Sequence, residues 1–116
     1  MTKTTAPAIL ERKGGPKISM VTAYDYPGAM IADRAGIDIL LIGDSVANVV
    51  HGMDTTLEIG LDEIVMHTRA VQRAKPEGMV VSDMPCLTFH LGPEDAVRNA
   101  GRLVREGGAE AVKLEG

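Results

Sequence analysis

The sequence is short of cysteine and of aromatic residues. Its 116 residues include one cysteine, Cys86, together with one phenylalanine, two tyrosines and no tryptophan. A single cysteine excludes an internal disulfide and a zinc site built from several cysteines, and it fits a reducing compartment. With so few aromatic rings, a folded core has to be built from Ile, Leu, Val, Met and Ala.

The chain also lacks an excess of positive charge and a long apolar segment. Its formal net charge is −4, whereas a nucleic-acid partner usually requires a basic patch that displaces counterions. No apolar run approaches the ~18 residues that cross a bilayer, and the polar start, residues 1–5, lacks the apolar core of a secretion signal. We therefore expect a cytoplasmic protein with no nucleic-acid or membrane partner.

Apolar runs of strand length alternate along the chain with segments of helical period. The predicted strands are 18–23, 38–43, 79–83 and 111–115, and the predicted helices are 27–35, 61–75 and 93–106. This alternation predicts an α/β fold with a parallel sheet and right-handed crossovers. Residues 1–16 form an N-terminal extension with a short helix over 6–13, and the long connection 44–60 is expected to be functional.

Three of the predicted strands end in a carboxylate, namely Asp44, Asp83 and Glu115. Asp83 follows Asp44 by 39 residues and Glu115 follows Asp83 by 32, each about one strand-plus-helix unit. The carboxyl ends of parallel strands meet at one edge of the sheet, where α/β proteins place their chemistry. Mg²⁺ prefers oxygen ligands, usually a few carboxylates with water and substrate. The spacing therefore predicts a site for a hard divalent cation.

Side-chain alternation along each strand predicts which residues share a face. The sets expected on the interior face of a barrel are Leu40, Ile42 and Asp44; Met79, Val81 and Asp83; and Lys113 and Glu115. In the last strand this face is fully charged, although charges are rarely buried unpaired. Lys113 and Glu115 therefore either neutralise nearby partners or form a site.

Other polar groups give weaker signals. The three histidines share no metal-ligand spacing: His67 falls within a helix and fits a surface or packing role, whereas His51 and His90 fall in loops near strand ends. Ser45 follows Asp44 directly and is either a helix cap or a contact for a substrate carboxylate. Cys86 is expected to be a small buried hydrophobe.

Six blocks in order give the chain a resemblance to a known family. They are Thr22-Ala23-Tyr24-Asp25-Tyr26, Gly43-Asp44-Ser45, Gly52-Met53-Asp54-Thr55-Thr56-Leu57, His67-Thr68-Arg69-Ala70-Val71, Asp83-Met84-Pro85 and Val112-Lys113-Leu114-Glu115-Gly116. From about Ile18 to its last residue, the chain resembles the ketopantoate hydroxymethyltransferases. The residue after Asp83-Met84-Pro85, often an apolar aromatic in the family, is Cys86 here, and 87–92 diverge as well.

The resemblance implies a (βα)₈ barrel of the phosphoenolpyruvate mutase/isocitrate lyase-like kind, Mg²⁺ as cofactor and a homo-oligomer. The family transfers a hydroxymethyl group from the co-substrate 5,10-methylenetetrahydrofolate to 3-methyl-2-oxobutanoate, through a Mg-stabilised enolate. The product is 2-dehydropantoate (ketopantoate), in the first committed step of pantothenate and coenzyme A biosynthesis.

The resemblance also implies roles for individual residues. Asp44, Asp83 and Glu115 would bind the metal, and Asp44, Ser45, Asp83 and Lys113 would bind the 2-oxo acid. The general base of the family is a glutamate on a later strand, which is expected beyond Gly116.

A complete barrel needs about 250 residues, so we expect residues 17–116 to be its N-terminal half, strands one to four. The chain would be a fragment or a truncated gene product, and its unpaired edge strands would make it poorly soluble, oligomeric or dependent on a complementing half-barrel. It would then be inactive alone. Two alternatives stay open: a Mg-dependent C–C or P–C lyase of the phosphoenolpyruvate mutase/isocitrate lyase type, and a non-catalytic half-barrel fragment.

Overall fold

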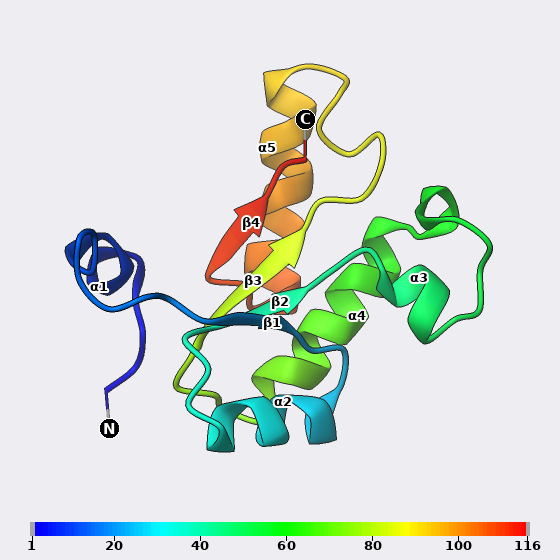
Figure 1. Ribbon diagram of the computed structural model, residues 1–116. Coiled ribbons are helices and arrows are strands. Elements are labelled where there is room, and N and C mark those ends of the chain that lie inside the picture. Colours follow the sequence, from blue (N-terminus) through cyan, green and yellow to red (C-terminus); the bar gives the residue numbers. More distant parts are fainter. Residues whose placement is uncertain (1, 116) are drawn as a thin grey trace.

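Four parallel strands form one sheet in the computed structural model, which describes residues 2–115 (Figure 1). The strands are β1 (Met20–Thr22), β2 (Ile39–Ile42), β3 (Met79–Asp83) and β4 (Ala111–Lys113). The helical elements are α1 (Ala6–Glu11), α2 (Tyr26–Arg34), α3 (Val46–Val49), the 3-10 turn η1 (Thr56–Glu58), α4 (Leu61–Gln72), α5 (Pro93–Arg102) and the π-helical turn η2 (Leu103–Gly107).

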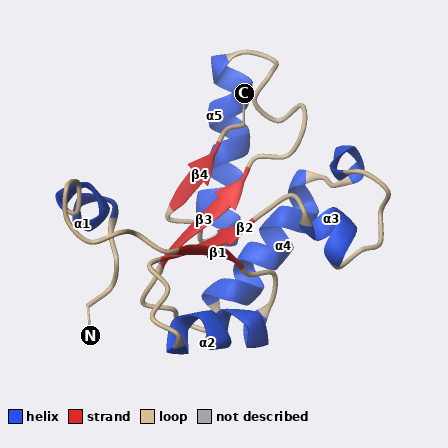
Figure 2. Ribbon diagram, in the orientation of Figure 1, coloured by secondary structure: helices blue, strands red, loops and turns tan. Residues whose placement is uncertain are grey.

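The strands lie in chain order, and each pairs in parallel with the next. A helix, α2, α4 or α5, lies in each connection between neighbours, and these helices run along one side of the sheet (Figure 2). The alternation predicted from the sequence is thereby confirmed, and β1 and β4 are the two edges of the sheet within residues 2–115. Within the same residues, none of the helices combines the length and hydropathy needed to cross a membrane.

The core lies between the sheet and these helices, and its composition corrects one prediction from strand parity. Leu40 and Ile42 are fully buried and belong to one apolar cluster with Ile64 of α4. Ile42 pairs with Ser82, whose hydroxyl lies 2.6 Å from the Thr68 hydroxyl of α4. Leu40 and Ile42 therefore face the helices, and the assignment of these two residues to the barrel interior is wrong.

Two segments contain local structure that the sequence did not predict. The connection 44–60 holds α3 and η1, which are too short to show a helical period. The helix expected over 93–106 changes at Leu103 into a π-helical turn. In that turn Gly107 packs closely on α4, where an added Cβ would lie 3.2 Å from the side chain of Thr68. A tight inter-helix contact of this kind leaves no periodic signal in the sequence.

The N-terminal segment packs against the amino-terminal ends of the strands, opposite the predicted site. Lys3 Nζ donates to the carbonyl of Gly78 at 2.6 Å and forms an ion pair with Glu110 at 2.9 Å. The short leading helix expected from the sequence is α1, which ends just before Arg12. The guanidinium of Arg12 donates to Asp38 Oδ1 at 2.6 Å and so attaches this segment to the start of β2.

Gly78 marks a close approach between chain segments that can be tested. A Cβ at this position would lie 2.5 Å from the carbonyl oxygen of Ile37 and 2.6 Å from Leu40 Cδ1. Gly78→Ala is therefore expected to lower the free energy of unfolding by about 1–3 kcal/mol, the usual cost of overpacking. Urea denaturation measures this change. The control, Gly101→Ala in α5, adds a Cβ that meets no atom within 4 Å, and it should keep or slightly raise stability. Equal effects of the two substitutions would contradict the packing argument.

The carboxylate of Asp38 is expected to make part of the free energy of unfolding depend on pH. A hydrogen bond from the Ser19 main-chain N–H and a second bond from Arg12 hold the pKa of Asp38 below its usual value. This stabilisation is present above the unfolded pKa, about 3.9, and is lost as the pH falls through the lower folded pKa. Asp38→Asn is therefore expected to be less stable than the unmodified chain at pH 7, by about 1 kcal/mol or more. The difference should shrink below pH ~4, as measured by urea denaturation across pH. Glu11→Gln, at an exposed carboxyl of α1, is the control, and a difference for Asp38→Asn that stays constant with pH would refute the assignment.

Candidate functional site

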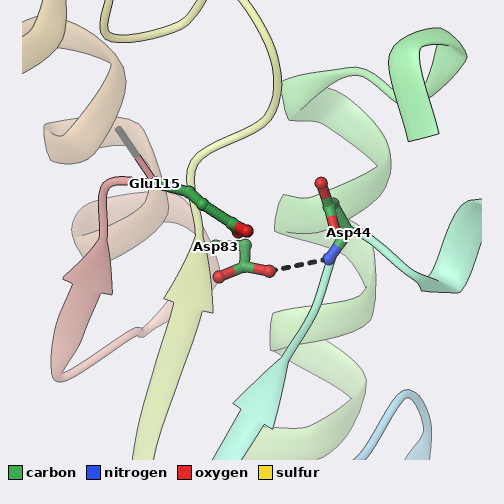
Figure 3. Close-up of side chains that lie close together, drawn as sticks. All are labelled: Asp44, Asp83 and Glu115. Atoms are coloured by element: carbon green, nitrogen blue, oxygen red, sulfur yellow. Dashed lines mark hydrogen bonds between the residues drawn. The ribbon is translucent and has the colours of Figure 1, made fainter.

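Three carboxylates meet at the carboxyl-terminal edge of the sheet (Figure 3). Asp44 follows β2, Asp83 is the last residue of β3, and Glu115 follows β4. One oxygen from each of the three lies within 4.8 Å of the others. Asp83 is buried, Asp44 is half-buried and Glu115 is exposed. The structure thus brings together the three residues that the spacing singled out.

Asp44 reaches this cluster through a turn, not through the strand parity expected for it. β2 ends at Ile42, and the chain turns at Gly43. The main-chain N–H of Asp44 then donates to Asp83 Oδ2 at 2.9 Å, as drawn in Figure 3. Gly43 leaves the space for this approach, because a Cβ there would lie 3.2 Å from Ser45 Oγ and 3.5 Å from Asp83 Oδ2. The cluster therefore depends on the backbone of the turn as well as on the carboxylates.

Lys113 lies beside Asp83 because the two residues are opposite each other in the pairing of β3 with β4. Its Nζ is 3.0 Å from Asp83 Oδ1 and 3.3 Å from Glu115 Oε2. Asp83 Oδ1 is buried, and the Lys113 ammonium lies against it as an ion pair. The predicted proximity of Lys113 and Glu115 holds, and the buried Asp83 Oδ1 has the Lys113 ammonium as its charged partner.

The site carries more negative than positive charge. The three carboxylates face a single ammonium, which leaves a formal excess of two negative charges. The pKa of Asp44 is raised, first by burial and then by the charges of Asp83 and Glu115, while Lys113 and Thr56 partly oppose this shift. The pKa of Lys113 is raised as well, chiefly by its contact with Asp83, so the ammonium is retained. A divalent cation would match the excess charge.

The donor set suits a hard cation. The cluster offers only carboxylate oxygens, and Mg²⁺ is typically bound by a few such groups with water and substrate completing its shell. The buried Asp83 Oδ1, paired with Lys113, is an oxygen of this kind. The residues present therefore fit the Mg²⁺ that the sequence resemblance implies.

A chain of polar contacts beside the carboxylates has no counterpart in the sequence pattern. The Tyr24 hydroxyl lies 2.6 Å from Ser45 Oγ, and His67 Nδ1 lies 2.7 Å from the Tyr24 carbonyl oxygen. His67 Nε2 is in turn 2.9 Å from His51 Nε2. Of the two roles expected for His67, surface or packing, its burial fits the second, but its pairing with His51 follows no pattern in the sequence. The two histidines are 16 residues apart and come together only through the path of the 44–60 connection.

A small cavity next to the cluster corrects the prediction for Cys86. The cavity has a volume of about 170 Å³. Its lining residues are Asp44, Met84, Cys86, Phe89, His90 and Glu115. Cys86 is exposed, so the expectation of a buried small hydrophobe is wrong. The chain has left the sheet by this point, and Pro85 fills the buried position before it. His90, a weak candidate in the sequence, reaches the same cavity but lies outside the carboxylate cluster.

The family model and the related sequences that match this chain agree on one family. Residues 3–116 match the family model described as ketopantoate hydroxymethyltransferase. A 3-methyl-2-oxobutanoate hydroxymethyltransferase from Acetivibrio thermocellus is 55% identical over 113 residues, which cover 97% of this chain and 40% of that protein. One of the same name from Staphylothermus marinus is 52% identical over 116 residues, covering 100% of this chain and 42% of its own length. The chain thus spans about 40% of the length of the curated relatives it matches.

Solved structures with low sequence identity share the fold. A 2,3-dimethylmalate lyase, described as a phosphoenolpyruvate mutase/isocitrate lyase superfamily member, superposes with a TM-score of 0.70 at 22% identity, covering 98% of this chain and 40% of that one. A phosphoenolpyruvate phosphomutase from Streptomyces platensis subsp. rosaceus gives 0.71 at 20% identity, covering 95% and 37%. The predicted barrel-type α/β fold of this superfamily is confirmed for the part that the chain spans. By the match over residues 3–116 and identities above 50%, the chain belongs to the ketopantoate hydroxymethyltransferase family.

Proposed function

We propose that the whole protein transfers a hydroxymethyl group from 5,10-methylenetetrahydrofolate to 3-methyl-2-oxobutanoate and so forms 2-dehydropantoate. The observation that carries this proposal is the cluster of Asp44, Asp83 and Glu115 with Lys113 at the strand ends, in a chain of this family. The chain would contribute the metal-binding part of the site. The two solved structures with the same fold are named a lyase and a phosphomutase. At 20–22% identity, their similarity to this chain is evidence for the fold alone.

Asp44, Asp83 and Glu115 would hold Mg²⁺. Bound there, Mg²⁺ would serve as a Lewis acid that gathers the carboxylate and keto oxygens of the 2-oxo acid and favours loss of its C3 proton. The site's formal excess of two negative charges supports a divalent over a monovalent ion. Asp83 is the best-placed ligand, because it is the buried member of the cluster and its position is fixed by Lys113 and by the Asp44 main chain.

Lys113 and Ser45 would contact the 2-oxo acid. The Lys113 ammonium already lies at the cluster, 3.0 Å from Asp83 Oδ1, and it would add positive charge beside the substrate carboxylate. Ser45 follows Asp44 in the same turn, so its hydroxyl can donate to the same group. Both residues would orient the substrate with its C3 carbon free.

The remaining parts of the reaction would come from outside residues 1–116. We propose that residues 17–116 are part of a barrel and that residues 1–16 extend it at the N-terminus. The further strands would cover the edges of β1 and β4 and would supply the base that accepts the C3 proton. A homo-oligomer in the reducing cytoplasm is the expected setting.

Mg²⁺ binding tests the metal site directly. The test uses a chimaera in which residues 1–116 replace the matching part of the Acetivibrio thermocellus relative. In this chimaera, Asp83→Asn is expected to raise the dissociation constant for Mg²⁺ by a factor of about ten, which corresponds to about 1.4 kcal/mol. It removes one charge and a buried ligand oxygen. Isothermal titration calorimetry gives the dissociation constants. Glu58→Gln, at an exposed acid of η1 outside the cluster, is the matched control. Equal affinities for the two variants would argue against the site.

Proton exchange tests the proposed chemistry. In the same chimaera, 3-methyl-2-oxobutanoate in D₂O is expected to gain deuterium at C3, and chelation of Mg²⁺ should stop the exchange. NMR of the substrate follows the reaction. Mg²⁺ binding without any exchange would support the non-catalytic alternative. Cleavage of a C–C or P–C bond without dependence on folate would support the lyase alternative.

A further inference from the structure

Two connections at the carboxyl-terminal edge of the sheet and helix α4 are joined by one polar chain. Tyr24 follows β1, Ser45 follows β2, and His67 lies in α4. This polar chain runs from Ser45 Oγ to the Tyr24 hydroxyl (2.6 Å). It continues from the Tyr24 carbonyl oxygen to His67 Nδ1 (2.7 Å). It ends at His51, whose Nε2 lies 2.9 Å from His67 Nε2. The other end of the polar chain is the hydroxyl of Ser45, the residue next to Asp44.

The hydrogen bonds to His67 fix the direction of this chain. A carbonyl oxygen only accepts, so His67 Nδ1 must carry the hydrogen that it donates to Tyr24. In neutral His67 the Nε2 atom is then an acceptor, and His51 Nε2 donates to it. His67 is buried, with 8% of its surface exposed, so its ring is held by packing as well. The main chain of Tyr24 is therefore fixed from the α4 side.

The hydroxyl of Ser45 is not used as a helix cap. Serine at a helix N-cap normally accepts a hydrogen bond from a main-chain N–H of the first turn. Ser45 occupies that position before α3 but makes no such bond. Its hydroxyl is paired with the Tyr24 hydroxyl instead. When Tyr24 donates in this pair, the hydrogen of Ser45 is free to point toward an anionic group at the site.

We propose that Tyr24 is a positioning residue that orients the Ser45 hydroxyl toward the carboxylate of the bound 2-oxo acid, with His67 and His51 holding the Tyr24 main chain. The proposal rests on the proposed function, because it takes Ser45 as a substrate contact. Tyr24 acts only through Ser45 and is not itself a metal ligand. It therefore governs the affinity for the 2-oxo acid and leaves the affinity for Mg²⁺ unchanged.

The test compares two identical substitutions made two residues apart. In the chimaera, Tyr24→Phe is expected to raise the KM and the dissociation constant of 3-methyl-2-oxobutanoate about tenfold, with kcat and the Mg²⁺ dissociation constant within about twofold. Tyr26→Phe removes the hydroxyl of an exposed tyrosine in α2, and it should leave all four constants unchanged. Thermal unfolding of both variants verifies that they fold.

A double-mutant cycle separates positioning from packing. If Tyr24 acts through Ser45, Tyr24→Phe should add little to the loss of substrate affinity already caused by Ser45→Ala. A full additional loss in the Ser45→Ala background, or a parallel loss of Mg²⁺ affinity, would overturn the proposal, as would equal constants for Tyr24→Phe and Tyr26→Phe. Absence of Mg²⁺-dependent C3 exchange in the unmodified chimaera would instead refute the proposed function, and the positioning role would fall with it.

Discussion

The parallel register of β3 with its neighbours is the constraint on which the site depends. It sets Asp83 opposite Lys113, so their side chains lie together at the ends of β3 and β4 and form a 3.0 Å ion pair. All five residues of β3 are buried. A slip of one residue would exchange its two faces, placing Asp83 among the helices and Ser82 at the site. The packing of the core therefore fixes the position of the charged groups. The pairing of β3 with β4 is enough to place Asp83 beside Lys113.

The site has two parts that are held in different ways. The carboxylate part comes from strand ends and is positioned by the sheet, with the Asp44 main chain tied to Asp83. The hydroxyl part comes from the connections after β1 and β2 and is positioned by side chains, with His67 of α4 as the link. The two parts meet at adjacent residues, Asp44 and Ser45. A ligand with one end on a cation and the other on a hydroxyl would use both parts at once.

The sheet and the carboxylate cluster could be predicted because both follow from regular periods in the sequence. Strand and helix lengths set the spacing of Asp44, Asp83 and Glu115, and parallel strands end at one edge. Features that depend on irregular backbone could not be predicted in this way. Leu40 and Ile42 lie on the helix side, and the turn at Gly43 still brings Asp44 to the cluster. The same holds for the pairing of His51 with His67 and for the exposure of Cys86, since loop geometry decides both.

The three carboxylates are held to different degrees, and this difference bears on how a cation would act. The side chain of Asp83 is 5% exposed, whereas that of Glu115 is 68% exposed and is held mainly by its 3.3 Å contact with Lys113. Bringing Glu115 toward Asp44 and Asp83 opposes like charges, and one ammonium offsets only part of that cost. A bound divalent cation would supply the rest of the free energy. Because a ligand that binds only one arrangement of a site stabilises that arrangement, cation binding and the placement of Glu115 beside Asp44 and Asp83 would then be parts of one equilibrium.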